Sequence, residues 1–166
     1  MFRLVSLRPS AFAVAALAVL CLAGHVAAGD PVPFKGDLEG DVTITPLTPP
    51  YVKVLVEATG NATHLGECTL DIPHKVNRTD RTAVGAYVFT AANGDMLFAD
   101  FTGKATPTAT PGVLYIEETA TITGGTGRFA GATGSFVCER LFDMITGTTI
   151  GSFEGTISDD DDGNDD

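Results

Sequence analysis

The sequence lacks tryptophan altogether and has few cysteines, histidines and basic residues. Its 166 residues include three Cys and three His, and Lys+Arg 10 stand against Asp+Glu 21, a formal net charge of −11. This charge argues against nucleic acid as a partner, since phosphates are bound by basic surfaces. His64, His74 and two distant cysteines provide no ligand spacing for zinc. We therefore expect no metal and no cofactor.

Long apolar runs are also missing, apart from one near the N-terminus. Arg3 and Arg8 precede an apolar run over residues 11–24, and small residues at 26–28 complete a cleavage-site pattern. The run is shorter than the roughly 20 residues that span a bilayer, so a membrane anchor is the less fitting alternative. The pattern predicts a signal peptide over residues 1–28, a secreted or periplasmic protein, and no membrane anchor after cleavage.

The remainder predicts one domain with short extensions. Residues 29–33 are read as a linker, 34–158 as a single β-barrel domain and 159–166 as an acidic tail. Like charges in the tail repel one another, which predicts disorder. The tail is not an EF-hand, because Ser158 stands at the first ligand position and the glutamate of position twelve is missing.

Two cysteines remain after the predicted cleavage, Cys68 and Cys138. In an oxidising compartment an even pair is most simply one disulfide. The alternative is a pair of buried free thiols that pack as small apolar side chains.

Short β-rich runs alternate with Gly, Pro, Asn and Asp from Phe34 onward. In residues 51–58 the valines and Ala58 share one face, while Lys53 and Glu57 lie on the other, as in a half-buried antiparallel strand. We expect eight strands, at residues 35–45, 51–58, 62–72, 84–91, 96–104, 113–123, 127–142 and 148–158.

The connections between these strands indicate how they pair. Turn residues at 60–61, 92–94 and 124–126 are typical of hairpins, so consecutive strands are expected to be neighbours. Closure of such a meander removes its exposed edges. The predicted fold class is all-β, an eight-stranded antiparallel up-and-down β-barrel. A two-sheet β-sandwich is the alternative, because it uses the same alternation.

The segment "TITGGTGRFAGATGSF", residues 121–136, resembles a signature of the dirigent and allene-oxide-cyclase-like β-barrels. The matching residues are Gly125, Thr126, Gly127, Phe129, Ala132 and Gly134. Two further segments, "ANGDMLFADFTG" and "GSFEGTIS", are similar to secreted bacterial proteins with this signature. The resemblance implies an antiparallel eight-stranded barrel, often a homo-oligomer, whose apolar cavity holds a small lipid-like or phenolic molecule. The glycines themselves are expected to form a sharp corner, with Phe129 closing one end.

Glu118 is the candidate catalytic and ligand-binding residue. Strict alternation over 113–123 places it on one face with Ile116 and Ala120, pointing inward, where a carboxylate serves as a general acid or base or as a polar anchor. The alternative is a bulge or register shift that returns it to solvent, since Glu117 precedes it and one residue flips the face.

Three further side chains could lie either inside the barrel or on its surface. His64 shares strand parity with Cys68, which predicts an inward ligand-binding residue, but a single histidine in a strand is also an ordinary packed or surface residue. Arg128 and Arg140 either hold a buried carboxylate or, as we expect, cover the outer surface.

Three functions fit this sequence. The favoured one is binding of a small apolar molecule in the barrel interior. The second is a dirigent- or cyclase-like enzyme that acts on a reactive intermediate, assisted by Glu118. The third is a structural module with a filled core. An interior cavity of a few hundred Å³ would favour the first two.

Overall fold

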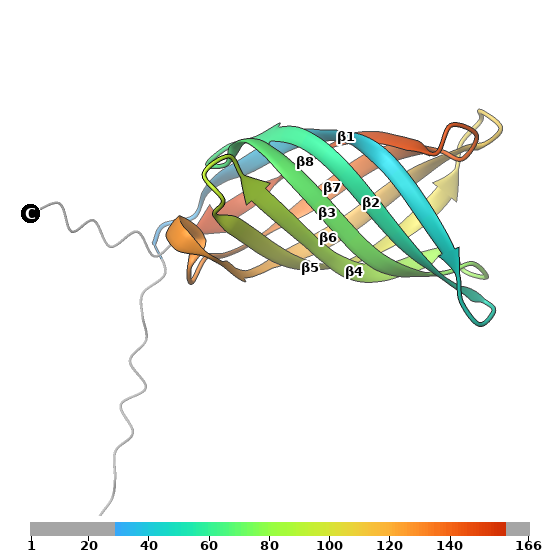
Figure 1. Ribbon diagram of the computed structural model, residues 1–166, viewed down its shortest axis with the longest axis horizontal. Helices are drawn as coiled ribbons and strands as arrows, with labels where there is room; N and C mark the ends of the chain where they lie inside the picture. The colour runs from blue at the N-terminus through green and yellow to red at the C-terminus, as the bar shows by residue number, and fades with distance from the viewer. Residues whose placement is uncertain (1–28, 159–166) are drawn as a thin grey trace, which may run out of the picture.

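The computed structural model describes residues 29–158, which form a closed antiparallel β-barrel (Figure 1). Each strand pairs with its neighbours in sequence, and β1 also pairs with β8, so the sheet has no open edge. The predicted fold class is confirmed. The strands are β1 (Val32–Pro46), β2 (Tyr51–Ala62), β3 (Gly66–Asn77), β4 (Thr82–Ala91), β5 (Met96–Pro107), β6 (Val113–Gly125), β7 (Thr133–Asp143) and β8 (Thr148–Ser158).

The two predicted terminal segments, the signal peptide over 1–28 and the acidic tail over 159–166, lie outside the described residues. β1 begins at Val32, within the segment 29–33 that was expected to be a linker. Within residues 29–158, no helix has the length and apolar character needed to cross a membrane.

The turn between β2 and β3 lies at residues 63–65, later in the chain than the turn residues 60–61 suggested. Gly60 is instead a strand residue opposite Cys68. An added Cβ at Gly60 would lie 2.0 Å from the Asp37 carbonyl oxygen, so glycine is needed there for close packing of β1 on β2. The third strand begins at Gly66, after this later turn, and runs to Asn77, five residues beyond its predicted end.

The glycine-rich segment forms a corner between β6 and β7. It contains a single 3-10 turn, η1 (Gly127–Phe129), where a continuous strand over 127–142 was expected. Gly127 adopts a φ of 56°, and an added Cβ there would lie 1.9 Å from Asp95 Oδ1. Thr126 Oγ1 accepts a hydrogen bond from the Met96 backbone N–H, with 2.9 Å between the two atoms. Phe129 is fully buried. These contacts fix the corner against the start of β5.

The two ends of the barrel differ. One end, the closed end, carries η1, the start of β1 and the end of β8 (Figure 1). The other end, the mouth, carries the β1–β2, β3–β4, β5–β6 and β7–β8 connections. An aromatic plug fills the interior toward the closed end, with neighbouring ring centroids 5.1 to 5.9 Å apart. The plug consists of Phe34, Tyr87, Phe89, Phe136 and Phe153.

Both cysteines in the described part of the chain are free and buried, so the predicted disulfide is wrong. Cys68 lies on β3 and Cys138 on β7, with three strands between them in either direction around the barrel. The Cys68 thiol donates to the Gly60 carbonyl at 3.7 Å. Burial raises the pKa of Cys68, and that of Cys138 to about 11, so both remain protonated and unreactive near neutral pH.

Candidate functional site

A cavity of about 610 Å³ occupies the mouth end of the barrel and is called the mouth cavity below. Two buried polar residues, His74 and Arg140, line it from β3 and β7, whereas Arg78 and Arg81 line it from the exposed β3–β4 connection. The remaining wall is largely apolar and includes Val42, Val52, Val54, Val76, Leu114, Ile116 and Phe142. The barrel interior is therefore filled toward the closed end and hollow toward the mouth.

A buried ion pair lies between the aromatic plug and the mouth cavity. Glu118 is fully buried and Arg140 is 3% exposed. Arg140 Nη2 donates to Glu118 Oε1 at 2.7 Å, and Nε donates to Oε2 at 3.0 Å. The Tyr87 hydroxyl donates to the same Oε2, and Arg140 Nη1 donates to Thr149 Oγ1 at 3.4 Å. This geometry is the planar two-point pairing that a guanidinium makes with a carboxylate.

Glu118 faces inward, as strict alternation predicted. The strand irregularity that would have turned it to solvent does exist, but it lies farther along β6, opposite Phe98 and Ala99 on β5. Arg140 was expected on the outer surface, and that expectation is wrong. Arg140 shares its strand face with Cys138 and Phe142, and the inward carboxylate of Glu118 compensates its charge.

The network keeps both donors to Glu118 in their protonated forms. Burial alone would lower the pKa of Arg140, but the Glu118 carboxylate raises it overall, so Arg140 stays cationic. Burial, reinforced by the Glu118 charge, raises the pKa of Tyr87 well above its ordinary value. Glu118 accepts three hydrogen bonds here and does not itself line the mouth cavity, whereas Arg140 does.

His74 presents an unshared electron pair to the mouth cavity. Its Nδ1 lies 2.9 Å from the Ile72 carbonyl oxygen, which can only accept, so Nδ1 carries the proton. Burial lowers the pKa of His74, with a further lowering from the nearby Arg140 charge. The neutral ring therefore leaves Nε2 as an acceptor. The ring packs edge-on against Phe101 at 5.6 Å.

His74 was not predicted as a site residue, because the third strand was expected to end at residue 72. Continuing the inward parity of Leu70 and Ile72 by one step would have placed His74 inside. A second signal was available in the glycines. Three glycines lie opposite these polar residues on neighbouring strands, and an added Cβ would fall 2.3 to 2.5 Å from their side chains. The pairs are Gly85 with His74, Gly103 with Glu118, and Gly151 with Arg140.

The other sequence candidates lie outside the mouth cavity. His64 is exposed in the β2–β3 turn with a φ of 66°, and its Nε2 lies 3.1 Å from the Pro33 carbonyl oxygen. It does not share the interior with Cys68, because the turn breaks the strand parity on which that reading rested. Arg128 is on the surface, as expected, with Nε 3.8 Å from Asp95 Oδ2 and its guanidinium over the Phe129 ring.

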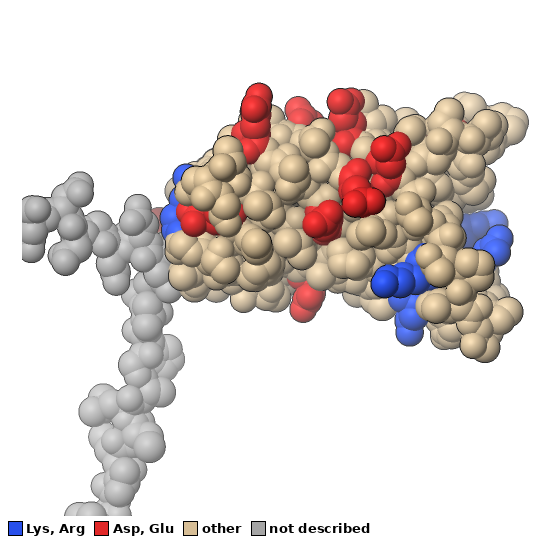
Figure 2. Space-filling view, viewed as in Figure 1, with Lys and Arg blue, Asp and Glu red and all other residues tan. Residues whose placement is uncertain are grey.

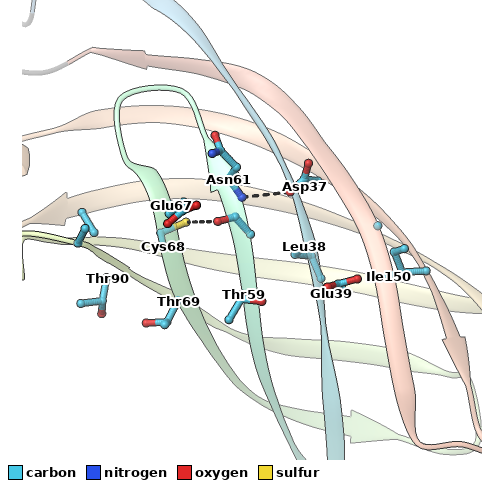
Figure 3. A pocket seen from close by; sticks show the side chains of 14 residues that line it. Asp37, Leu38, Glu39, Thr59, Asn61, Glu67, Cys68, Thr69, Thr90 and Ile150 are labelled. Atoms are coloured by element: carbon cyan, nitrogen blue, oxygen red, sulfur yellow. Dashed lines mark hydrogen bonds between the residues drawn. The ribbon is translucent and has the colours of Figure 1, made fainter.

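A second concavity, of about 930 Å³, lies on the outer wall across β1–β4 and β8 (Figure 3). Asp37, Glu39 and Glu67 contribute carboxylates to it, and Thr59 and Thr69 contribute hydroxyl groups. All five side chains are exposed, so this groove is open to solvent along its length. In the described chain, no cluster of three or more His, Cys, Asp and Glu side chains is arranged to hold a metal ion. The mouth cavity is more enclosed and is the candidate site.

The buried His74 makes a pH dependence of stability testable. Its lowered pKa means that the unfolded chain binds a proton more readily than the folded protein. The stabilisation that His74 contributes is fully present above its pKa in the unfolded chain, about 6.5, and is lost as the pH falls toward its lower pKa in the folded protein. We expect His74→Gln to flatten this part of the profile when urea unfolding is measured between pH 7.5 and 5. His64→Gln, a matched change at an exposed site, should leave the slope unchanged. Equal slopes in wild type and His74→Gln would contradict the assignment.

Comparison with known proteins shows similarity at the level of the fold. No protein-family model matches the sequence, and no curated protein matches it. Among solved structures, the barrel is similar to the pterocarpan synthase dirigent protein GePTS1, with a TM-score of 0.54 and 12% sequence identity. The match covers 90% of this chain and 99% of that chain. The protein thus has a dirigent-like β-barrel fold. Secretion and bacterial origin stay predictions.

Proposed function

We propose that the protein binds a small, largely apolar molecule with one polar end in the mouth cavity. The observation that carries this proposal is the cavity itself, about 610 Å³ with mostly apolar walls and two buried polar residues. Binding sites for small molecules commonly combine such walls with a few fixed polar groups. A purely structural barrel would be expected to fill this space as the aromatic plug fills the other half.

The two polar residues define the polar end of the ligand. His74 Nε2 accepts a hydrogen bond, and the Arg140 guanidinium has more N–H donors than its contacts with Glu118 and Thr149 use. A hydroxyl or carbonyl group, as in a phenol or an oxygenated lipid, matches this donor and acceptor. In this scheme Glu118 and Tyr87 are positioning residues, because Glu118 holds the guanidinium, Tyr87 holds the Glu118 carboxylate, and neither lines the cavity.

A cyclase- or dirigent-like reaction in the same cavity is the second candidate function. The observation that favours it is the neutral His74, whose Nε2 is available to take a proton from a bound hydroxyl group. The similarity to a protein described as a pterocarpan synthase dirigent protein supports the fold that this reading needs. It assigns no substrate to this chain.

An extrinsic fluorescent probe tests binding, since the protein has no tryptophan. We expect anilinonaphthalene sulfonate to bind the folded protein and Val54→Phe, which fills the cavity from the inner face of β2, to weaken binding by about tenfold. Val84→Phe is the matched control, because this valine is 51% exposed on the outer wall. Equal binding by both variants, with circular dichroism showing intact folds, would overturn the proposal. If Val54→Phe alone weakens binding, native mass spectrometry of protein from its own host would identify the natural ligand.

A further inference from the structure

The outer face of β1, β2 and β3 carries charges in separate rows. The register of the three strands aligns their outward side chains in three rows. The acidic row is Asp41, Glu57 and Asp71; the middle row is Thr43, Leu55 and Pro73; the basic row is Thr45, Lys53 and Lys75. All residues of the acidic and basic rows are exposed, whereas Leu55 and Pro73 in the middle row are half-buried.

These charges have no ion-pair partner within the described chain. Among residues 29–158 the ion pairs are Lys35 with Glu154, Arg128 with Asp95 and Arg140 with Glu118, none of which involves the two charged rows. Lys53 lies directly opposite Lys75, and Glu57 directly opposite Asp71. Like charges in such positions destabilise a sheet. Figure 2 shows most basic side chains in view toward the mouth end and acidic ones over the rest of that face.

A two-fold rotation makes this pattern complementary to itself. Two copies meet face to face, and the rotation axis lies in the plane between them. The axis runs along the middle row, perpendicular to the strands, so Leu55 of one copy meets Leu55 of the other. Each charged row is two residues, about 7 Å, from the axis, and the rotation brings the acidic row of one copy onto the basic row of the other. Glu57 then faces Lys53 of the second copy, and Asp71 faces Lys75 of the second copy, each pair occurring twice by symmetry.

We propose that this face is a homodimer interface with Leu55 and Pro73 at its centre. An anionic partner would be attracted by the basic row but repelled by the acidic row about 13 Å away. A cationic partner would be attracted by the acidic row but repelled by the basic row. A second copy, rotated, has the required order of charges on a matching apolar centre. Because the wall of a barrel is convex, the contact is a narrow strip held mainly by charge, and the dimer is expected to be salt-sensitive.

Exchange of two charges provides the test. Residues 53 and 57 are about 13 Å apart on β2, so they do not pair within one chain. We expect sedimentation velocity at low ionic strength to show a dimer of the wild-type protein, and 0.5 M NaCl to dissociate it. Glu57→Lys and Lys53→Glu should each weaken dimerisation by about tenfold or more through like-charge contacts across the axis. The double exchange Lys53→Glu/Glu57→Lys should restore it.

Mixing the two single variants gives a second readout. Positions 53 and 57 are both acidic in Lys53→Glu and both basic in Glu57→Lys. In a mixed dimer each acidic side chain therefore faces a basic one across the axis, so native mass spectrometry should show a one-to-one heterodimer. Asp100→Lys, an exposed reversal on β5, is the matched control and should leave association unchanged.

Two results would overturn the proposed dimer. The first is a wild-type protein that stays monomeric at low salt, and the second is a double exchange that fails to restore association. Loss of probe binding in the mouth cavity would not bear on the dimer, because the interface lies on the outer wall and the cavity lies inside the barrel.

Discussion

Replacing Arg140 with methionine is expected to destabilise the fold by about 3–5 kcal/mol, because it leaves the Glu118 carboxylate buried without its cation. Glu118 is fully buried, and its remaining partner would be the Tyr87 hydroxyl. Desolvation of an unpaired carboxylate is far more costly than loss of the side-chain packing that methionine largely replaces. Urea unfolding of the variant and the wild type measures the difference.

The double variant Arg140→Met/Glu118→Gln separates charge from packing. The introduced amide can still accept a hydrogen bond from Tyr87, and no uncompensated charge remains, so most of the lost stability should return. Two results would show that the fold does not depend on the Glu118–Arg140 ion pair. The first is a loss of less than about 1 kcal/mol in the free energy of unfolding of Arg140→Met, and the second is a double variant no more stable than the single one.

The second large effect is expected in the aromatic plug. Phe136→Ala should destabilise the protein by about 3–5 kcal/mol, since the ring is lost from a close-packed site and leaves a cavity. Phe136 is 2% exposed and contacts Phe34, Tyr87, Phe89 and Phe153, with centroid distances of 5.3 to 5.9 Å. Unfolding by urea again provides the measurement.

Val137→Ala is the control for the plug, because Val137 is the next residue on β7 but points outward and is 42% exposed. Its free energy of unfolding should change by about 0.5 kcal/mol or less. Similar losses in the two variants would mean that the closed half of the barrel is loosely packed, and the division into a filled half and a hollow half would fail.

Alternation of apolar and polar side chains was sufficient to predict the barrel. The valine face of β2 is buried as expected, and closure removes the edges that an open sheet would expose. The same alternation placed Glu118 inward. It could not identify the partner of Glu118, because Arg140 is 22 residues away and Tyr87 is 31 residues away, and their meeting depends on the register between strands.

Glycines limited the sequence analysis in a definite way. Gly60 was read as a turn residue, although its actual role is to let two strands approach closely. That reading shifted the third strand toward the N-terminus and left His74 unassigned. Gly94, in the predicted turn over 92–94, does lie in the connection between β4 and β5, with a φ of 90°. Sequence alone does not separate the two uses of glycine, since both depend on the missing side chain.

The separation of the two barrel ends has a practical consequence for handling the protein. Val32 and Ser158, where the first strand begins and the last one ends, both lie at the closed end (Figure 1). A tether joined downstream of Ser158 would hold the protein on a sensor chip with the opposite end turned toward the flowing solution. Small molecules could then approach unobstructed, whereas a tether inserted in the β3–β4 connection would stand in their path.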